Sequence, residues 1–138
     1  MKSVTTKPTG NQDAFDRAWQ HAVVNRSPQS VVNSPEGERS CRYLIENDDM
    51  QLCCLVGCML PDRLARLADQ GSCSGGQVIG SVIQEHDEVA RWFEHVSTDL
   101  LELIQLAHDS LSVVVYEDKI GRELCRVARM FNLNVPAV

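Results

Sequence analysis

The sequence predicts an α+β fold dominated by helices, in which about five helices pack around a short two-stranded antiparallel hairpin. Three observations predict this class. Apolar residues recur at helical spacing over most of the chain, two short apolar runs near its middle flank a polar turn, and the apolar fraction of 43% in 138 residues is that of an ordinary globular protein. We expect a single globular domain over residues 12–138, preceded by a flexible polar tail over residues 1–11.

The first helix is predicted to follow this tail, with Asn11 or Asp13 as its cap. Its buried face has the spacing i, i+4, i+7 and i+8 and consists of Phe15, Trp19, Ala22 and Val23. His21 lies off that face of an α-helix, so we expect a solvated imidazole there. Residues 25–40 are rich in proline, serine and asparagine, which predicts a loop with one short apolar anchor at residues 31–32.

The hairpin is predicted from two apolar runs, residues 41–45 and residues 52–56, with residues 47–49 as the polar turn between them. Pro61 suits the first turn of the next helix, because a helix start needs no backbone N–H from this residue. Asp62 favours the positive end of the same helix. A cysteine-lined hairpin that leads into a helix is therefore expected in the middle of the chain.

The second half of the chain is helical by pattern. Residues 77–96 form either one helix or two helices that are broken near His86. Ser97 or the residue after it caps the next helix. Residues 112–116 contain three successive valines, whose branched side chains favour an extended segment, so the last helix is predicted to start near Glu117.

The charge distribution and the lack of long apolar runs exclude several classes of protein. The net charge is −6, and residues 41–95 carry nine acidic side chains against four basic ones, which argues against nucleic-acid binding in this region. No apolar run approaches the roughly 20 residues that span a bilayer, and no apolar signal segment is visible at the amino terminus. We therefore expect no membrane partner and a cytoplasmic location, where thiols stay reduced.

Four of the six cysteines lie between residues 41 and 58, which raises the question of a metal or thiol site. Cys54 and Cys58 have the spacing of half a zinc site, but no second Cys or His pair of this spacing supplies the other half. The main interpretation is therefore a set of buried free thiols on a hairpin that bends at Gly57, and we expect no cofactor.

Two His-Asp dipeptides leave an enzymatic alternative open. His86-Asp87 and His108-Asp109 suggest a metal-dependent phosphohydrolase, although adjacency alone does not build such a site. His108 lies on the apolar stripe of its predicted helix, where a histidine is more often hydrogen-bonded in the core. The alternative is a metal- or thiol-dependent hydrolase with Cys54, Cys58 and His108 as its candidate residues.

A local basic stripe is the best exposed binding surface in the sequence. Four basic residues of the last helix fall at i, i+3, i+7 and i+10, namely Lys119, Arg122, Arg126 and Arg129. Together with Arg42 and Arg91 they are our candidates for binding an acidic partner or a phosphate ligand. The alternative interpretation is a solvated helix face that has no binding role.

Three segments resemble a family of small uncharacterised proteins carried by tailed phages and prophages. These segments are Cys41-Arg42-Tyr43, the run from Cys54 to Asp62, which contains Cys-x-Val-Gly-Cys-x-x-Pro-Asp, and the run from Leu103 to Asp109, which ends in His-Asp. The resemblance covers about two-thirds of the chain. It implies a phage origin, and the family has no established activity to carry over.

On these grounds we expect a non-enzymatic phage-type protein that binds and inhibits or modulates a host protein with a defence or regulatory role. The basic stripe and the acidic middle of the chain would be its contact surfaces, and the host cytoplasm its location. The alternative is an oligomeric protein that sequesters a small ligand such as a nucleotide signal, with arginines holding the phosphates. Homo-oligomers are compatible with both hypotheses.

Overall fold

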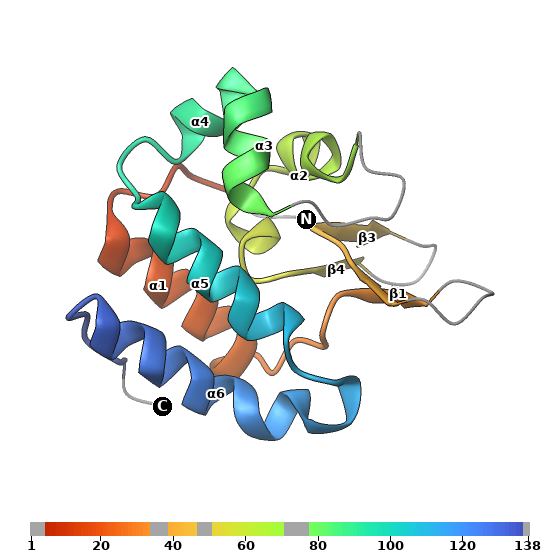
Figure 1. Cartoon of the computed structure of the whole chain (residues 1–138), viewed down its shortest axis with the longest axis vertical. Coiled ribbons are helices and arrows are strands. Elements are labelled where there is room, and N and C mark those ends of the chain that lie inside the picture. The colour runs from red at the N-terminus through yellow and green to blue at the C-terminus, as the bar shows by residue number, and fades with distance from the viewer. Residues whose placement is uncertain (1–4, 34–38, 47–50, 71–77, 137–138) are drawn as a thin grey trace.

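The computed structural model in Figure 1 describes residues 5–33, 39–46, 51–70 and 78–136. Helices dominate it, with two short antiparallel strand pairs, so the predicted α+β class is confirmed. Helices α1, α5 and α6 pack against one another, and the short strands lie to one side of them in Figure 1. The extents of the single domain and of the flexible tail stay predictions.

Helix α1 (Asn11–Trp19) continues without a break into a π-helix, η1 (Gln20–Val24). The cap differs from the expected one, because Gly10 occupies the N-cap position and Asp13 instead accepts a hydrogen bond from the Thr9 amide at 2.9 Å. The prediction of a solvated His21 was wrong. A π-turn holds more residues than an α-turn, so it rotates His21 inward, where its Nε2 lies 2.9 Å from the Cys53 carbonyl oxygen.

The strands form two separate antiparallel pairs. The first joins β1 (Val31–Asn33) to β2 (Arg39–Cys41), which corrects the prediction of a loop over residues 25–40. The second joins β3 (Leu44–Glu46) to β4 (Gln51–Cys53), so the predicted hairpin exists but is shorter and shifted. Its turn lies outside the described residues.

Helix α2 (Asp62–Asp69) starts directly after Pro61, as predicted. Its last carboxylate, on Asp69, accepts hydrogen bonds from the backbone amides of Tyr43 and Leu44 at 2.9 and 3.0 Å. This pair of bonds anchors α2 to the start of β3. Burial raises the pKa of Asp69, and the two amide bonds oppose that rise.

Residues 77–96 contain two helices, α3 (Ile79–Glu85) and α4 (Asp87–Trp92), which are broken at His86. Helix α5 (Thr98–Asp109) begins with the expected cap, because Ser97 Oγ accepts from the Leu100 amide at 3.4 Å. Helix α6 (Val113–Met130) begins four residues earlier than predicted, since its core stripe extends back to Tyr116, which is 4% exposed.

The core is built from every helix and from the bend after β4. Its largest fully buried side chains are Tyr43, Phe15, Leu55, Met59, Ile79, Leu100, Leu101, Ile104, Ile120, Leu124, His108 and Val56. Helix α5 lies at the centre, in contact with α1, α3 and α6. Among the described residues, none of the helices combines the length and the apolar character that a bilayer crossing needs.

Candidate functional site

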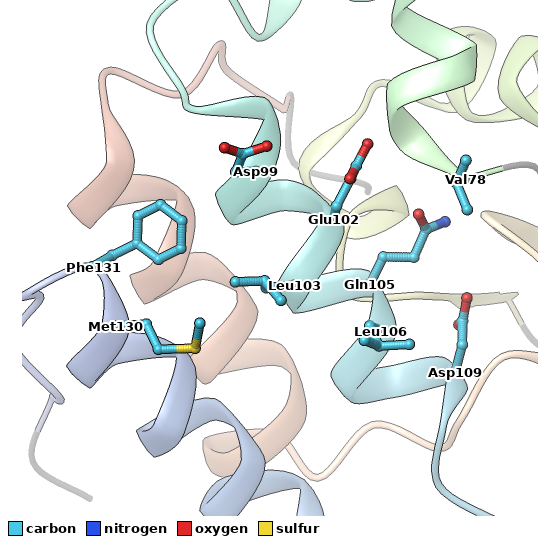
Figure 2. Close-up of a pocket in the computed structure, with 9 residues that line it drawn as sticks. All are labelled: Val78, Asp99, Glu102, Leu103, Gln105, Leu106, Asp109, Met130 and Phe131. Carbon is cyan, nitrogen blue, oxygen red and sulfur yellow. The ribbon is translucent and has the colours of Figure 1, made fainter.

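A groove of about 570 Å³ lies on the outer side of α5 (Figure 2). Its floor is the exposed face of α5, and its walls are the start of α3 and the end of α6. Its lining residues are Val78, Asp99, Glu102, Leu103, Gln105, Leu106, Asp109, Met130 and Phe131. The groove therefore combines apolar side chains with three carboxylates.

Helix α5 presents two faces because its apolar residues follow more than one stripe. The inner stripe, which includes Leu100, Leu101 and Ile104, is completely buried. On the outer side, Leu103 is half-buried and Leu106 is exposed, although both are apolar. Figure 2 shows Leu103 and Met130 pointing toward one another from α5 and α6. An apolar seam thus runs along the groove between these two helices.

Exposed apolar side chains gather at this groove. Of the seven large apolar residues that are exposed in the described ranges, three border it: Val78 at 58%, Leu106 at 58% and Met130 at 68%. Burying a side chain of this size is worth about 1.5–3 kcal/mol, so leaving three of them in water forgoes a substantial gain. An exposed apolar patch with a polar rim is typical of a contact surface.

The carboxylates of the groove add a negative rim. Asp99 and Glu102 are exposed, and within the described ranges neither forms an ion pair. The Glu102 carboxylate lies over Gly80 of α3, where an added Cβ would come within 2.1 Å of Oε1. Asp109 is held by His108. The field of this rim favours a cationic partner.

Gln105 links the groove to the core. Its Oε1 accepts from the Ile79 amide at 2.8 Å, and its Nε2 donates to the Tyr43 hydroxyl at 2.7 Å. These two bonds fix the amide orientation and join α5 to the start of α3. The floor of the groove is therefore held rigidly by buried hydrogen bonds.

His108, a metal candidate in the sequence, is a buried structural residue. Its Nε2 lies 3.1 Å from the Ser30 backbone nitrogen, and its Nδ1 lies 2.7 Å from Asp109 Oδ1. A backbone amide can only donate, so Nε2 accepts this hydrogen bond. Nδ1 therefore carries the ring proton and donates a hydrogen bond to Asp109 Oδ1. The ring also packs edge-on to Tyr116, with centroids 5.3 Å apart. Both nitrogens are thus committed to folding contacts.

Cys54 and Cys58 are likewise committed to the bend after β4. The Gly57 amide donates to Cys54 Sγ at 3.1 Å, and Cys58 Sγ donates to the Leu55 carbonyl at 3.0 Å. Burial raises the pKa of both thiols well above the usual value, so they stay protonated at neutral pH and are weak nucleophiles. Among the described residues, no three Cys, His, Asp or Glu side chains group as metal ligands.

The structure brings together a different Cys-His pair, which the sequence analysis missed. Cys53 Sγ lies 4.0 Å from His21 Nε2, beside a hollow that Cys58 and Arg17 also line. The same Nε2 donates to the Cys53 carbonyl, so it has no lone pair to take the thiol proton. Burial lowers the pKa of His21, which keeps the imidazole neutral. The π-turn that creates this pair left no signal in the sequence.

The predicted basic residues do not form one surface. Lys119, Arg122, Arg126 and Arg129 are all exposed on α6, and Arg126 pairs with Glu123. Arg91 lies on α4, at the opposite end of the molecule from α6 in Figure 1. There it lines a hollow of about 230 Å³ with Lys7 and Arg63. Arg42, between β2 and β3, is half-buried, and its charge acts on Asp69.

No protein-family model, no curated protein and no solved structure matches this chain. The resemblance to small phage proteins therefore stays a prediction.

Proposed function

We propose that this chain is a non-enzymatic binding protein that docks a protein partner in the groove between α3, α5 and α6. One observation carries the proposal: exposed Val78, Leu106 and Met130 border a groove in which Asp99 and Glu102 form no ion pair within the described ranges. Such a surface is stabilised when a partner covers the apolar seam and neutralises the rim. The partner chemistry that fits is a basic segment with apolar side chains.

The roles of the reactive side chains support a binding function over a hydrolytic one. His108 uses both ring nitrogens in hydrogen bonds, and the thiols of Cys54 and Cys58 hold the bend after β4. A general base or a metal ligand needs a lone pair that is free to act. The groove, by contrast, offers shape, apolar area and charge, which are the properties of an interface.

The phage resemblance suggests where the partner comes from. A protein that a phage carries into a cell meets host proteins, so we propose a host defence or regulatory protein as the partner and the host cytoplasm as the place of binding. The acidic rim disfavours nucleotides in this groove, because phosphates and carboxylates repel one another. A phosphate ligand fits the second hollow better, although Lys7 and Arg63 already pair there with Glu94 and Glu88.

Affinity capture from a host lysate with paired variants tests the proposal. Leu106→Asp places a fourth carboxylate in the groove without touching the core, since Leu106 is 58% exposed. Val114→Asp makes the same kind of change at an exposed apolar residue that does not line the groove. We expect the wild type and Val114→Asp to retain one stoichiometric protein and Leu106→Asp to lose it.

Two results would contradict the proposal. One is the recovery of no stoichiometric protein by the wild type, and the other is equal recovery by Leu106→Asp. A thermal shift that rises with nucleotide concentration and disappears in Arg91→Ala would favour the small-ligand alternative instead.

A further inference from the structure

We propose that a second copy of this chain covers the groove when no partner is bound, through a two-fold dimer in which α5 of each copy lies over α6 of the other. The inference goes beyond partner binding and stands on a separate observation. The outer sides of α5 and α6 carry opposite charges at the same spacing.

The outer residues of α5 and of α6 follow the same sequence intervals. Asp99, Glu102, Leu106 and Asp109 lie on the outer side of α5 at i, i+3, i+7 and i+10. Lys119, Arg122, Arg126 and Arg129 lie on the outer side of α6 at the same four intervals. This pattern of intervals is unchanged when it is reversed, so it also matches in antiparallel alignment. The acidic stripe therefore presents two exposed carboxylates, Asp99 and Glu102, whereas all four positions of the basic stripe are charged and exposed. Asp109 is half-buried and bonded to His108.

The two helices are antiparallel neighbours. Three residues connect them, and they pack against one another along their lengths (Figure 1). In this arrangement Asp99 lies at the same end as Arg129, and Asp109 at the same end as Lys119. Within the described ranges no ion pair joins the two stripes, because both point outward rather than toward each other.

The apolar seam separates the stripes. Met130 follows Arg126 by four residues, so the two are neighbours on the surface of α6, and Met130 also lines the groove with Leu103 and Leu106. A two-fold axis along this seam places α5 of each copy over α6 of the other and keeps the ends in register. Each acidic stripe then meets a basic stripe, while the seams of the two copies bury each other.

The seam and the stripes contribute differently to this dimer. Each exposed ion pair contributes little binding energy, so the apolar seam supplies most of the affinity. The stripes set the register and exclude the arrangement that places α5 over α5, because that arrangement opposes like charges. The dimer should therefore be concentration-dependent and weakened by salt.

The dimer competes with the partner, because both cover the same groove. Self-association thus keeps the apolar seam out of water until a protein with a basic apolar segment displaces the second copy. A variant that stays monomeric but keeps the groove intact should bind the partner more tightly than the wild type.

Complementary charge reversal tests the dimer by sedimentation velocity. The first variant, Asp99→Lys with Glu102→Lys, reverses the two exposed carboxylates of the α5 stripe. The second variant, Arg126→Glu with Arg129→Glu, reverses the two α6 charges that lie opposite Glu102 and Asp99 of the second copy. We expect each variant to sediment as a monomer of 15.4 kDa and an equimolar mixture of the two to restore the wild-type dimer mass. Restoration is specific to this interface. The dimer has two contacts between α5 of one copy and α6 of the other, and opposite charges meet at both contacts only when the two variants combine.

The control changes the same charge at a different place. Arg63→Glu with Arg66→Glu alters two exposed arginines of α2, and it should sediment like the wild type. A wild type that stays monomeric up to millimolar concentration, or a mixture that stays monomeric when the wild type dimerises, would overturn the inference. Circular dichroism of each variant shows that it is folded, so a loss of dimer cannot be assigned to unfolding.

The outcomes separate this inference from partner docking. A monomeric wild type that still captures a protein through Leu106 leaves the docking proposal standing and removes the dimer. A dimer that the equimolar mixture restores, in a protein that captures no partner, supports the dimer and removes the docking proposal. Improved capture by the Arg126→Glu, Arg129→Glu variant supports both, because this variant leaves every groove residue unchanged.

Discussion

The bend from Cys54 to Met59 and the groove on α5 differ in how their polar and apolar groups are used. In the bend, the Cys54 and Cys58 sulfurs hydrogen-bond to backbone groups, and Leu55 and Val56 are completely buried. In the groove, Leu106 and the carboxylates of Asp99 and Glu102 face water, and neither carboxylate forms an ion pair in the described ranges.

The comparison separates residues that the fold needs from residues that it leaves exposed. The cysteines and His108 have the more reactive side chains, yet their contacts are internal. Leu106 and Glu102 are ordinary residues, yet the fold leaves them exposed at a hollow. We therefore expect mutations in the bend to change stability and mutations in the groove to change binding. Four predictions, in decreasing order of their expected effect on stability, test this division.

Gly57→Ala should produce the largest loss of stability. A Cβ at this position would lie 2.0 Å from the Tyr43 carbonyl oxygen and 2.8 Å from its carbon, and neither backbone atom can rotate away. We expect the free energy of unfolding to fall by about 3 kcal/mol or more, as measured by urea denaturation. Gly121→Ala is the control, because its Cβ would meet Val23 at an ordinary 3.6 Å and alanine favours the helix. An equal loss in both variants would contradict the prediction.

His108→Leu should cost about 2 kcal/mol of unfolding free energy, because the buried Ser30 amide loses its acceptor. The leucine fills much of the space of the ring, so the loss reports the hydrogen bonds more than a cavity. His95→Leu removes an imidazole that is 57% exposed and should change stability by less than about 0.5 kcal/mol. If His108→Leu were as stable as the wild type, the buried network would not hold α5 to the start of β1.

His21 should make stability depend on pH. Burial lowers its pKa below the usual 6.5, so the unfolded chain binds a proton more readily than the folded chain. The stabilisation is complete above the unfolded pKa and is lost as the pH falls below it, with a slope of at most about 1.4 kcal/mol per pH unit for one proton. His21→Gln keeps a donor for the Cys53 carbonyl but does not titrate. Urea unfolding at pH 8 and pH 5 should therefore show a smaller difference for His21→Gln than for the wild type, and an equal difference would refute this role.

Local signals predicted most helix positions. Ser97 caps α5 and Pro61 precedes α2 as expected, because both signals act within one turn of the chain. The extended segment predicted from Val113–Val115 was wrong, since branched residues lower helix propensity by only a fraction of a kcal/mol each. Burial of Tyr116 on the core side of α6 outweighs that penalty. Tertiary packing thus decided a position that propensity suggested wrongly.

Pairing between distant residues was harder to predict. The strand pair β1–β2 lies in a segment whose prolines and serines are typical of a loop, and its register appears only when the segment folds back on itself. The π-turn at η1 depends on what surrounds it rather than on residue type, so the inward position of His21 was missed.

The groove forms where helices that are distant in sequence pack together, so no single segment of the sequence predicts it. Its walls come from residues more than 20 positions away from its floor on either side. One signal did exist, since Leu103 and Leu106 are apolar residues outside the buried stripe of α5. A helix with an apolar residue on its polar face can be a solvated surface or a contact surface, and charge alone does not distinguish them.

Leu106→Ala should have the smallest effect on stability and tests the other side of the comparison. Leu106 is 58% exposed, so its truncation removes little buried area, and alanine is at least as good a helix former. We expect the free energy of unfolding to change by less than about 0.5 kcal/mol in urea denaturation. The same substitution at Leu101, on the buried face of the same helix, should cost about 3 kcal/mol. A large loss at Leu106 would show that the groove side of α5 serves the fold, and its exposed leucine would then be no sign of an interface. A negligible loss would show that the fold does not need this apolar side chain, which is the result that the docking proposal requires.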